Sequence, residues 1–170
     1  MQTLTWFRYD LRVDDNESFL QSLKSNKNLL VYIFDENIWK DQTSSTFHLK
    51  FTIDSLEDLK NQLMVKYNAH LNIYYGDTLE ILKHLIKKYN ITHVNSNRIF
   101  RGLLTNRIDN TCKDLFNENS IEWKIFNQFG IQLSKRNRST WSKDWRRFMS
   151  RKIQNQSDFK CKFISDSMMT

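Results

Sequence analysis

The first residues whose side chains could bind a ligand or react form a charged turn. This turn follows a short apolar run near the amino terminus. Arg8 and Arg12 bracket the carboxylate of Asp10, and Asn16 closes the turn. Asp10 could hold either guanidinium through charge-assisted hydrogen bonds and stiffen the turn, or the turn could contact a ligand directly. The sequence favours the structural role for Asp10, and Asn16 could also cap a following helix.

Basic and aromatic side chains alternate in a second segment, between residues 135 and 152. Its cations are Lys135, Arg136, Arg138, Lys143, Arg146, Arg147, Arg151 and Lys152. Asp144 is the only acidic residue there, so the segment carries a net charge of +7, which equals the net charge of the whole chain. Together with Trp141 and Trp145, the cations could bind nucleic acid, meeting phosphates by charge and bases by stacking.

The same segment permits a second interpretation. Its aromatic residues recur at helical intervals and would form the apolar face of a short helix. That face could dock on the rest of the chain or on a further domain, with the cations on its solvent side. The sequence favours docking and leaves nucleic-acid binding as the alternative. In either case, the residues expected to act are Arg136, Arg138, Trp141, Trp145, Arg146 and Arg147.

The cysteines, histidines and glycines exclude several kinds of site. Cys112 and Cys161 are too few for a disulfide framework and too far apart for a metal or redox motif. The four histidines are scattered, so no metal site is expected. The charged turn contains no glycine, which argues against a dinucleotide site, and neither a Walker loop nor a Gly-x-Ser-x-Gly elbow occurs.

Short apolar runs alternate with amphipathic stretches, which is typical of a parallel sheet whose strands are joined by helices. Strands are expected at 4–7, 29–34, 71–75, 93–95 and 121–126, and helices at about 16–24, 47–67, 78–89 and 105–116. Right-handed crossovers would make this an α/β domain with a doubly wound five-stranded parallel sheet. Ligands of such folds bind beyond the carboxyl ends of the strands.

The chain divides into three parts by composition. Residues 1–127 form the expected α/β domain, 128–152 a basic aromatic extension with a short helix, and 153–170 a polar tail. The longest apolar run is 29–34, whereas a membrane helix needs about 20 residues. No charged and then apolar leader follows Met1, so we expect a cytoplasmic protein that does not enter a membrane.

The charged turn resembles the opening signature of the DNA photolyase and cryptochrome family. The matching residues are Trp6-Phe7-Arg8-x-Asp10-Leu11-Arg12-x-x-Asp15-Asn16. Two later segments are similar to the family's second helix and to the segment after its fourth strand: Phe51-x-x-x-Ser55-Leu56-x-Asp58-Leu59 and Val94-x-x-Asn97-Arg98. The start of the interdomain region in one bacterial branch resembles Arg138-x-x-Trp141-x-x-x-Trp145-x-x-Phe148-Met149.

This resemblance implies an N-terminal α/β domain that works with a larger helical domain, which binds FAD and damaged DNA. In photolyases, photoexcited reduced FAD donates an electron to a flipped pyrimidine dimer, which then splits. The chain ends where that helical domain would begin. We therefore expect no catalytic residue in it, an FAD-binding photolyase domain as its partner, and contact with DNA only through that partner.

Members of the family differ in the antenna chromophore that their α/β domain carries. The resemblance implies that a folate or flavin antenna would be held by loops containing Arg8, Asp10, Arg12, Asn16 and Asn97. Ile99 stands where deazaflavin-binding relatives are expected to use an acidic residue, so a deazaflavin is not expected. The alternative function is a free-standing regulatory module that binds a small nucleotide or chromophore on the same scaffold.

Overall fold

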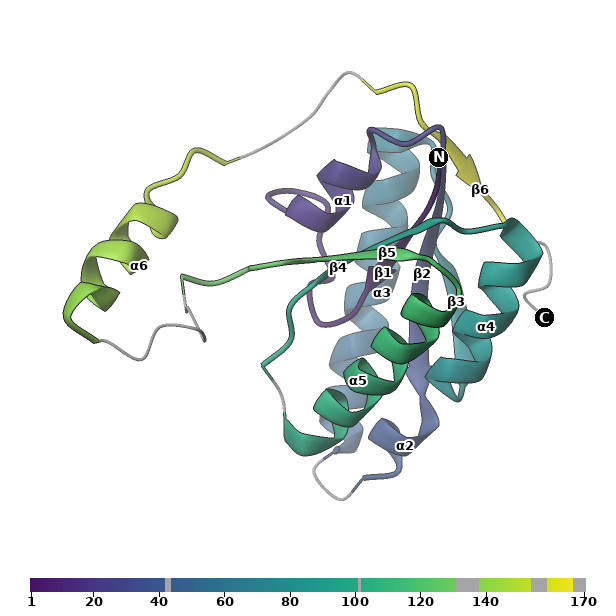
Figure 1. Cartoon of the computed structure of the whole chain (residues 1–170), viewed down its shortest axis with the longest axis horizontal. Coiled ribbons are helices and arrows are strands. Elements are labelled where there is room, and N and C mark those ends of the chain that lie inside the picture. The colour runs from purple at the N-terminus through teal and green to yellow at the C-terminus, as the bar shows by residue number, and fades with distance from the viewer. Residues whose placement is uncertain (42–43, 101, 131–137, 154–158, 167–170) are drawn as a thin grey trace.

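The structure, a computed structural model, describes residues 1–41, 44–100, 102–130, 138–153 and 159–166. Five parallel strands lie in the order β3-β2-β1-β4-β5 (Figure 1). Their bounds are β1 Gln2–Phe7, β2 Lys27–Asp35, β3 Asn72–Gly76, β4 His93–Asn97 and β5 Glu122–Phe126. The expected parallel α/β sheet is confirmed, with each strand close to its predicted position.

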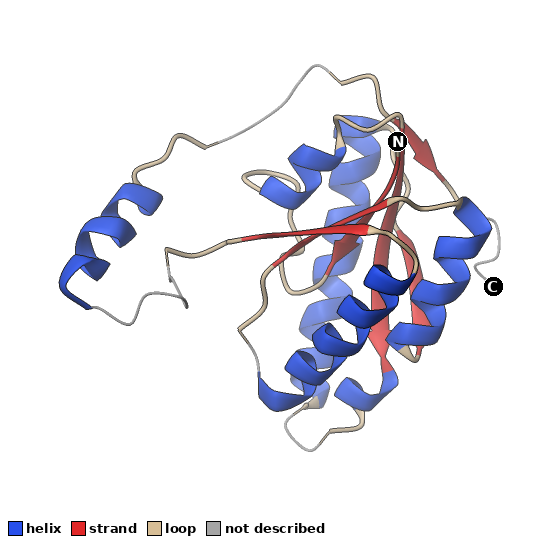
Figure 2. Cartoon of the chain, viewed as in Figure 1, coloured by secondary structure: helices blue, strands red, loops and turns tan. Residues whose placement is uncertain are grey.

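Helices cover both faces of the sheet because successive side chains along a strand point to opposite faces (Figure 2). On β2, Leu29 and Val31 belong to the apolar core that includes α4 (Thr78–Tyr89) and α5 (Gly102–Glu118). Leu30 and Tyr32 belong to the core that includes α1 (Glu17–Ser22) and α3 (Thr46–Tyr67). The sheet is therefore doubly wound, as predicted.

Side-chain caps fix where the helices begin. Asn16, Ser45 and Asp77 each accept a hydrogen bond from a backbone N–H in the first turn of α1, α3 and α4. Asp35 does the same for α2 (Glu36–Trp39), a four-residue helix that the sequence did not predict. One turn of helix is too short to show an apolar period, so only its cap could have indicated it.

A sixth strand, β6 (Lys162–Ile164), lies in the segment that was expected to be a polar tail. It pairs in parallel with the start of β2, from Lys27 to Leu29. Phe163 and Ile164 pack against the two cores, one on each. The side chain of Asn72 donates to the backbone oxygen of Ile164 (3.2 Å), which joins β6 to the start of β3. The few apolar residues among many polar ones gave no strand pattern, so the strand was missed.

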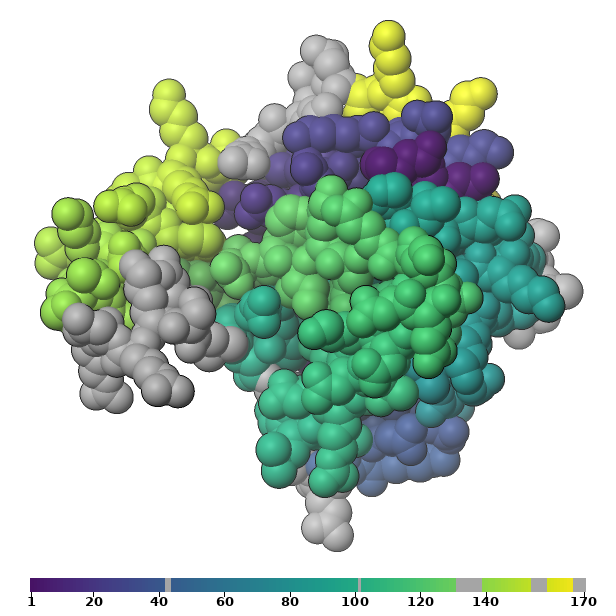
Figure 3. Space-filling model, in the orientation of Figure 1, coloured from purple at the N-terminus to yellow at the C-terminus, as the bar shows by residue number. Residues whose placement is uncertain are grey.

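After β5 the chain leaves the sheet and forms α6 (Trp141–Met149) to one side of it (Figure 1). In the space-filling view, α6 forms a lobe at one end of the molecule (Figure 3). None of the nine residues of α6, all of them described, is buried. No helix within the described residues is both long and apolar enough to cross a membrane.

Candidate functional site

The candidate site lies where the strand order reverses, between β1 and β4. The chain continues from β1 toward β2 and from β4 toward β5, so the loops after these strands diverge and leave a crevice at their carboxyl ends. Residues 8–16 follow β1, and Asn97 ends β4. The structure thus brings the charged turn and Asn97 to one place.

Asp10, Asn16 and Asn97 form a buried hydrogen-bond network in this crevice, with exposed fractions of 2%, 0% and 1%. The Asp10 carboxylate accepts from the backbone N–H of Arg8 (3.0 Å), from Nδ2 of Asn16 (3.2 Å) and from Nδ2 of Asn97. Nδ2 of Asn97 also donates to Oδ1 of Asn16 (2.8 Å), the oxygen that caps α1. Three donors therefore compensate the buried carboxylate.

The expectation that Asp10 holds a guanidinium is wrong for both neighbouring arginines. Arg8 is buried and forms an ion pair with Asp109 of α5, with Nη1 3.2 Å from Oδ2, and its guanidinium lies 4.3 Å from the ring centre of Trp6. Arg12 is exposed and donates to a backbone oxygen within the turn (3.1 Å). Of these two arginines, Arg12 is the one that a ligand could reach.

A hollow of about 170 Å³ opens beside Arg12, between the charged turn and the end of α6. Its charged lining residues are Arg12, Asp15, Glu17, Arg151 and Lys152. Asn97 also lines it, and Oδ1 of Asn97 is buried without a hydrogen-bond partner among the described residues. Three of its five charged lining residues are cations, so the hollow could take a small ligand that carries negative charge.

A second cavity lies at the carboxyl ends of β1 and β2, lined by residues that include Trp6, Trp39, Ile99 and Ile108. Its volume is about 30 Å³. That is about the share of one water molecule, whereas pockets for drug-sized ligands enclose about 300–1,000 Å³. The cavity does not fit the ring system of a folate or a flavin in this conformation.

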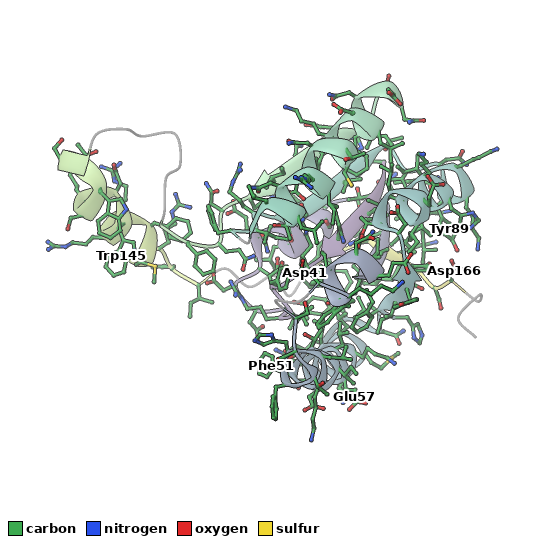
Figure 4. The ribbon with its side chains drawn as sticks, turned by 90° about the horizontal axis from the view of Figure 1, so that it is seen from below. Asp41, Phe51, Glu57, Tyr89, Trp145 and Asp166 are labelled. Carbon is green, nitrogen blue, oxygen red and sulfur yellow. The ribbon has the colours of Figure 1, made fainter. Side chains whose placement is uncertain are left out.

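The basic aromatic segment stands apart from the Asp10 network, and Figure 4 shows Trp145 at one end of the molecule. Trp141 and Trp145 stack on each other, with ring centroids 6.4 Å apart and planes inclined by 21°. Of the remaining predicted residues, Arg146 and Arg147 are exposed on α6, and Arg136 and the side chain of Arg138 lie outside the described residues. The structure does not bring these cations to Asp10, although Arg151 and Lys152 reach the hollow beside Arg12.

The described residues provide neither a reactive thiol nor a metal cluster. Burial raises the pKa of the Cys112 thiol to about 12 and also raises the pKa of Cys161. Both thiols are therefore protonated at neutral pH and are poor nucleophiles. No group of three or more His, Cys, Asp or Glu side chains that could hold a metal ion occurs in the described part of the chain.

Sequence reasoning missed two carboxylates that hold this edge of the sheet together. Asp109 pairs with Arg8 from 101 positions away, and no local pattern connects the two residues. Asp35 accepts from the backbone N–H of Asn37 (2.9 Å) and of Thr78 (3.1 Å), and so ties the start of α2 to the start of α4. An aspartate directly after a buried strand is the signal that could have identified Asp35 as a cap.

Comparison with known proteins gives a consistent result. A family model described as DNA photolyase matches residues 3–129. Cryptochrome-1 of Anopheles gambiae is 30% identical over 100 residues, which cover 54% of this chain and 18% of that protein. Cryptochrome DASH, chloroplastic/mitochondrial, of Solanum lycopersicum is 34% identical over 93 residues, which cover 51% of this chain and 16% of that protein. The matched stretches therefore cover less than a fifth of the length of these relatives.

Solved structures share the fold at lower sequence identity. The archaeal photolyase from Sulfolobus tokodaii has a TM-score of 0.78 at 20% identity, over 96% of this chain and 39% of that one. The bacterial class III photolyase from Agrobacterium tumefaciens has a TM-score of 0.70 at 22% identity, over 82% of this chain and 28% of that one. These two similarities concern the fold alone.

Proposed function

Because the chain belongs to the DNA photolyase family, we propose that it is the α/β half of a light-driven flavoprotein that repairs pyrimidine dimers in DNA. In this proposal it acts with an FAD-binding domain that lies outside these 170 residues. The observation that carries the proposal is the family match over residues 3–129, which spans all five strands from β1 to β5.

The residues of the charged turn support a positioning role for this half. Asp10, Asn16 and Asn97 are buried and bonded to one another, so they hold the loops after β1 and β4 in place. Arg8 is likewise buried and paired with Asp109. FAD supplies light-driven electron transfer when it is bound in its own domain. We assign no bond-breaking step to this chain.

The first half of α3 offers a surface for the FAD-binding domain. None of residues 46–55 is buried, although Phe47 and Phe51 are 85% and 74% exposed and lie one turn apart. Phe51 projects from α3 at the lower edge of Figure 4. An apolar helix face of this kind marks a protein contact, and relatives about three times as long contain further residues that could cover it.

An antenna chromophore is not part of this proposal. Of the residues predicted to hold an antenna, only Arg8 lines the cavity beside Trp39 and Ile99, whose volume is about that of one water molecule. The light-absorbing group in this proposal is the FAD of the partner domain.

The test is to purify the protein from its native cells, record its near-ultraviolet and blue absorption, and identify the domains that accompany it by mass spectrometry. We expect the protein to co-purify with an FAD-binding domain and to show a flavin absorption spectrum. We also expect loss of pyrimidine dimers from DNA on illumination. Phe51→Asp should release the flavin, whereas Val65→Asp, at an 85% exposed position in the other half of α3, should not. A colourless protein without light-dependent repair would overturn the proposal.

One observation favours a second candidate function, that of a regulatory module for a small nucleotide. Arg12, Arg151 and Lys152 line one hollow together with Asn97. Titration calorimetry with ATP and AMP tests this candidate. Binding that Arg12→Gln abolishes would support it, and no heat at millimolar nucleotide would exclude it.

A further inference from the structure

Helix α6 carries an aromatic and apolar stripe that the described residues leave about half exposed. Trp141, Trp145 and Met149 are spaced four residues apart and so lie along one side of the helix. They are 50%, 40% and 57% exposed. The two indole rings are nearly parallel, with their planes inclined by 21° and their centroids 6.4 Å apart. The stripe therefore presents flat aromatic surface to its surroundings.

The residues around the stripe are strongly cationic. Lys143, Arg146 and Arg147 on α6, and Arg151 and Lys152 just beyond it, are all exposed. Asp144 is the only carboxylate in this stretch, and its side chain is only 10% exposed. Any partner that covers the tryptophans therefore meets several positive charges and must bring negative charge of its own.

Trp145 of the stripe packs closely against Gly130, four residues beyond the end of β5. A Cβ atom at Gly130 would lie 2.7 Å from Cδ1 of Trp145 and 3.1 Å from its Cα, so only glycine allows this approach. Asp144 and Phe148 line a hollow of about 340 Å³ between α6 and the β5 end. One side of α6 thus faces the body of the protein, and Trp141 is left open.

We propose that α6 is a binding element for single-stranded nucleic acid, independent of sequence, in which bases stack on Trp141 and Trp145 and the surrounding arginines and lysines hold the phosphates. Unpaired bases have free faces for stacking, whereas bases in a duplex are already stacked. Each nucleotide also supplies one negative charge, which matches the excess of cations along α6. A protein partner would instead need an equally acidic surface around a tryptophan-sized pocket.

The test is fluorescence anisotropy of a labelled oligothymidylate of about 12 nucleotides, titrated in the dark with the full chain at several salt concentrations. Trp141→Ala should weaken binding about tenfold at constant salt. Tyr75→Ala, which removes an exposed aromatic ring from β3, should leave the affinity unchanged. Arg146→Gln should reduce the slope of log affinity against log salt by about 0.7, and Lys60→Gln, at an exposed position of α3, should not.

Equal losses in Trp141→Ala and Tyr75→Ala would overturn the proposal, because binding would then not depend on stacking at α6. Equal effects of Arg146→Gln and Lys60→Gln would also overturn it, because binding would then reflect net charge alone. Tighter binding to vesicles of phosphatidylserine than to the oligonucleotide, with the same dependence on Trp141, would assign α6 to membranes and also overturn it. The measurement needs neither flavin nor light, so its outcome is independent of the proposed repair function.

Discussion

The α/β domain and helix α6 differ in where their apolar side chains and their charges lie. In the α/β domain, apolar residues from both faces of the sheet are buried under four helices, and the residues outside 135–152 have no net charge. In α6, no residue is buried, and the segment around it carries the +7 of the whole chain. The buried apolar residues of the α/β domain stabilise the chain's own fold. The exposed aromatic and basic residues of α6 are suited to binding a partner.

The largest expected difference between the two regions is in stability. Leu30→Ala removes a fully buried side chain of β2 and should lower the free energy of unfolding by about 3 kcal/mol, because it leaves a cavity in the core. Trp141→Ala should change it by less than about 0.5 kcal/mol, although it removes more atoms. Urea denaturation of the full chain, followed by circular dichroism, measures both. Similar losses in the two variants would show that α6 belongs to the cooperative core.

A smaller effect is expected within the Asp10 network. Asp10→Asn should lower the free energy of unfolding by about 2 kcal/mol. The reason is that an amide nitrogen would then face the donors from Arg8, Asn16 and Asn97. Asp14→Asn is a matched control: Asp14 is exposed and pairs with Lys66 at 2.7 Å on the surface, so its loss should cost less than about 0.5 kcal/mol. If both variants unfold at the same urea concentration, the network does not hold the crevice.

The strands and long helices of the α/β domain could be predicted from the sequence because each has a local signal. An apolar run predicts a buried strand such as β2, and apolar residues at helical spacing predict α3. The missed parts depend on distant partners. β6 is ordered by pairing with Lys27–Leu29, and its own few apolar residues give no period.

The candidate site shows the same division between local and distant signals. The sequence identified the residues of the charged turn, and a cap at Asn16 could be predicted from its type and position. The partners of Asp10 and Arg8 could not be predicted, because Asn97 and Asp109 are about 90 and 100 positions away and reach the crevice through the strand order. Charge alone suggested that the two nearby arginines would be the partners of Asp10.

A third predicted effect on the free energy of unfolding, that of Cys112, appears only at alkaline pH. The Cys112 thiol has a pKa of about 12 in the folded chain and 9.0 as the reference value, because burial disfavours the thiolate. Above pH 9 the unfolded chain loses this proton while the folded chain keeps it, so stability falls by about 1.4 kcal/mol per pH unit. Cys112→Ala should remove that part of the slope. Urea unfolding at a series of pH values above 9 tests this, and identical slopes in both proteins would contradict it.

The smallest expected effect concerns the contact that joins the two regions. Gly130→Ala places a methyl group where Trp145 now lies, and α6 can move away because none of its residues is buried in the sheet. The free energy of unfolding should therefore change by less than about 0.5 kcal/mol, while an aqueous quencher gains access to tryptophan and trypsin cleaves faster after Arg146 and Arg147. Ser142→Ala, an exposed change on α6 itself, is the control and should alter neither readout. A loss of stability in Gly130→Ala as large as that in Leu30→Ala would mean that α6 and the sheet unfold as one unit. The α/β domain would then not be stable independently of α6.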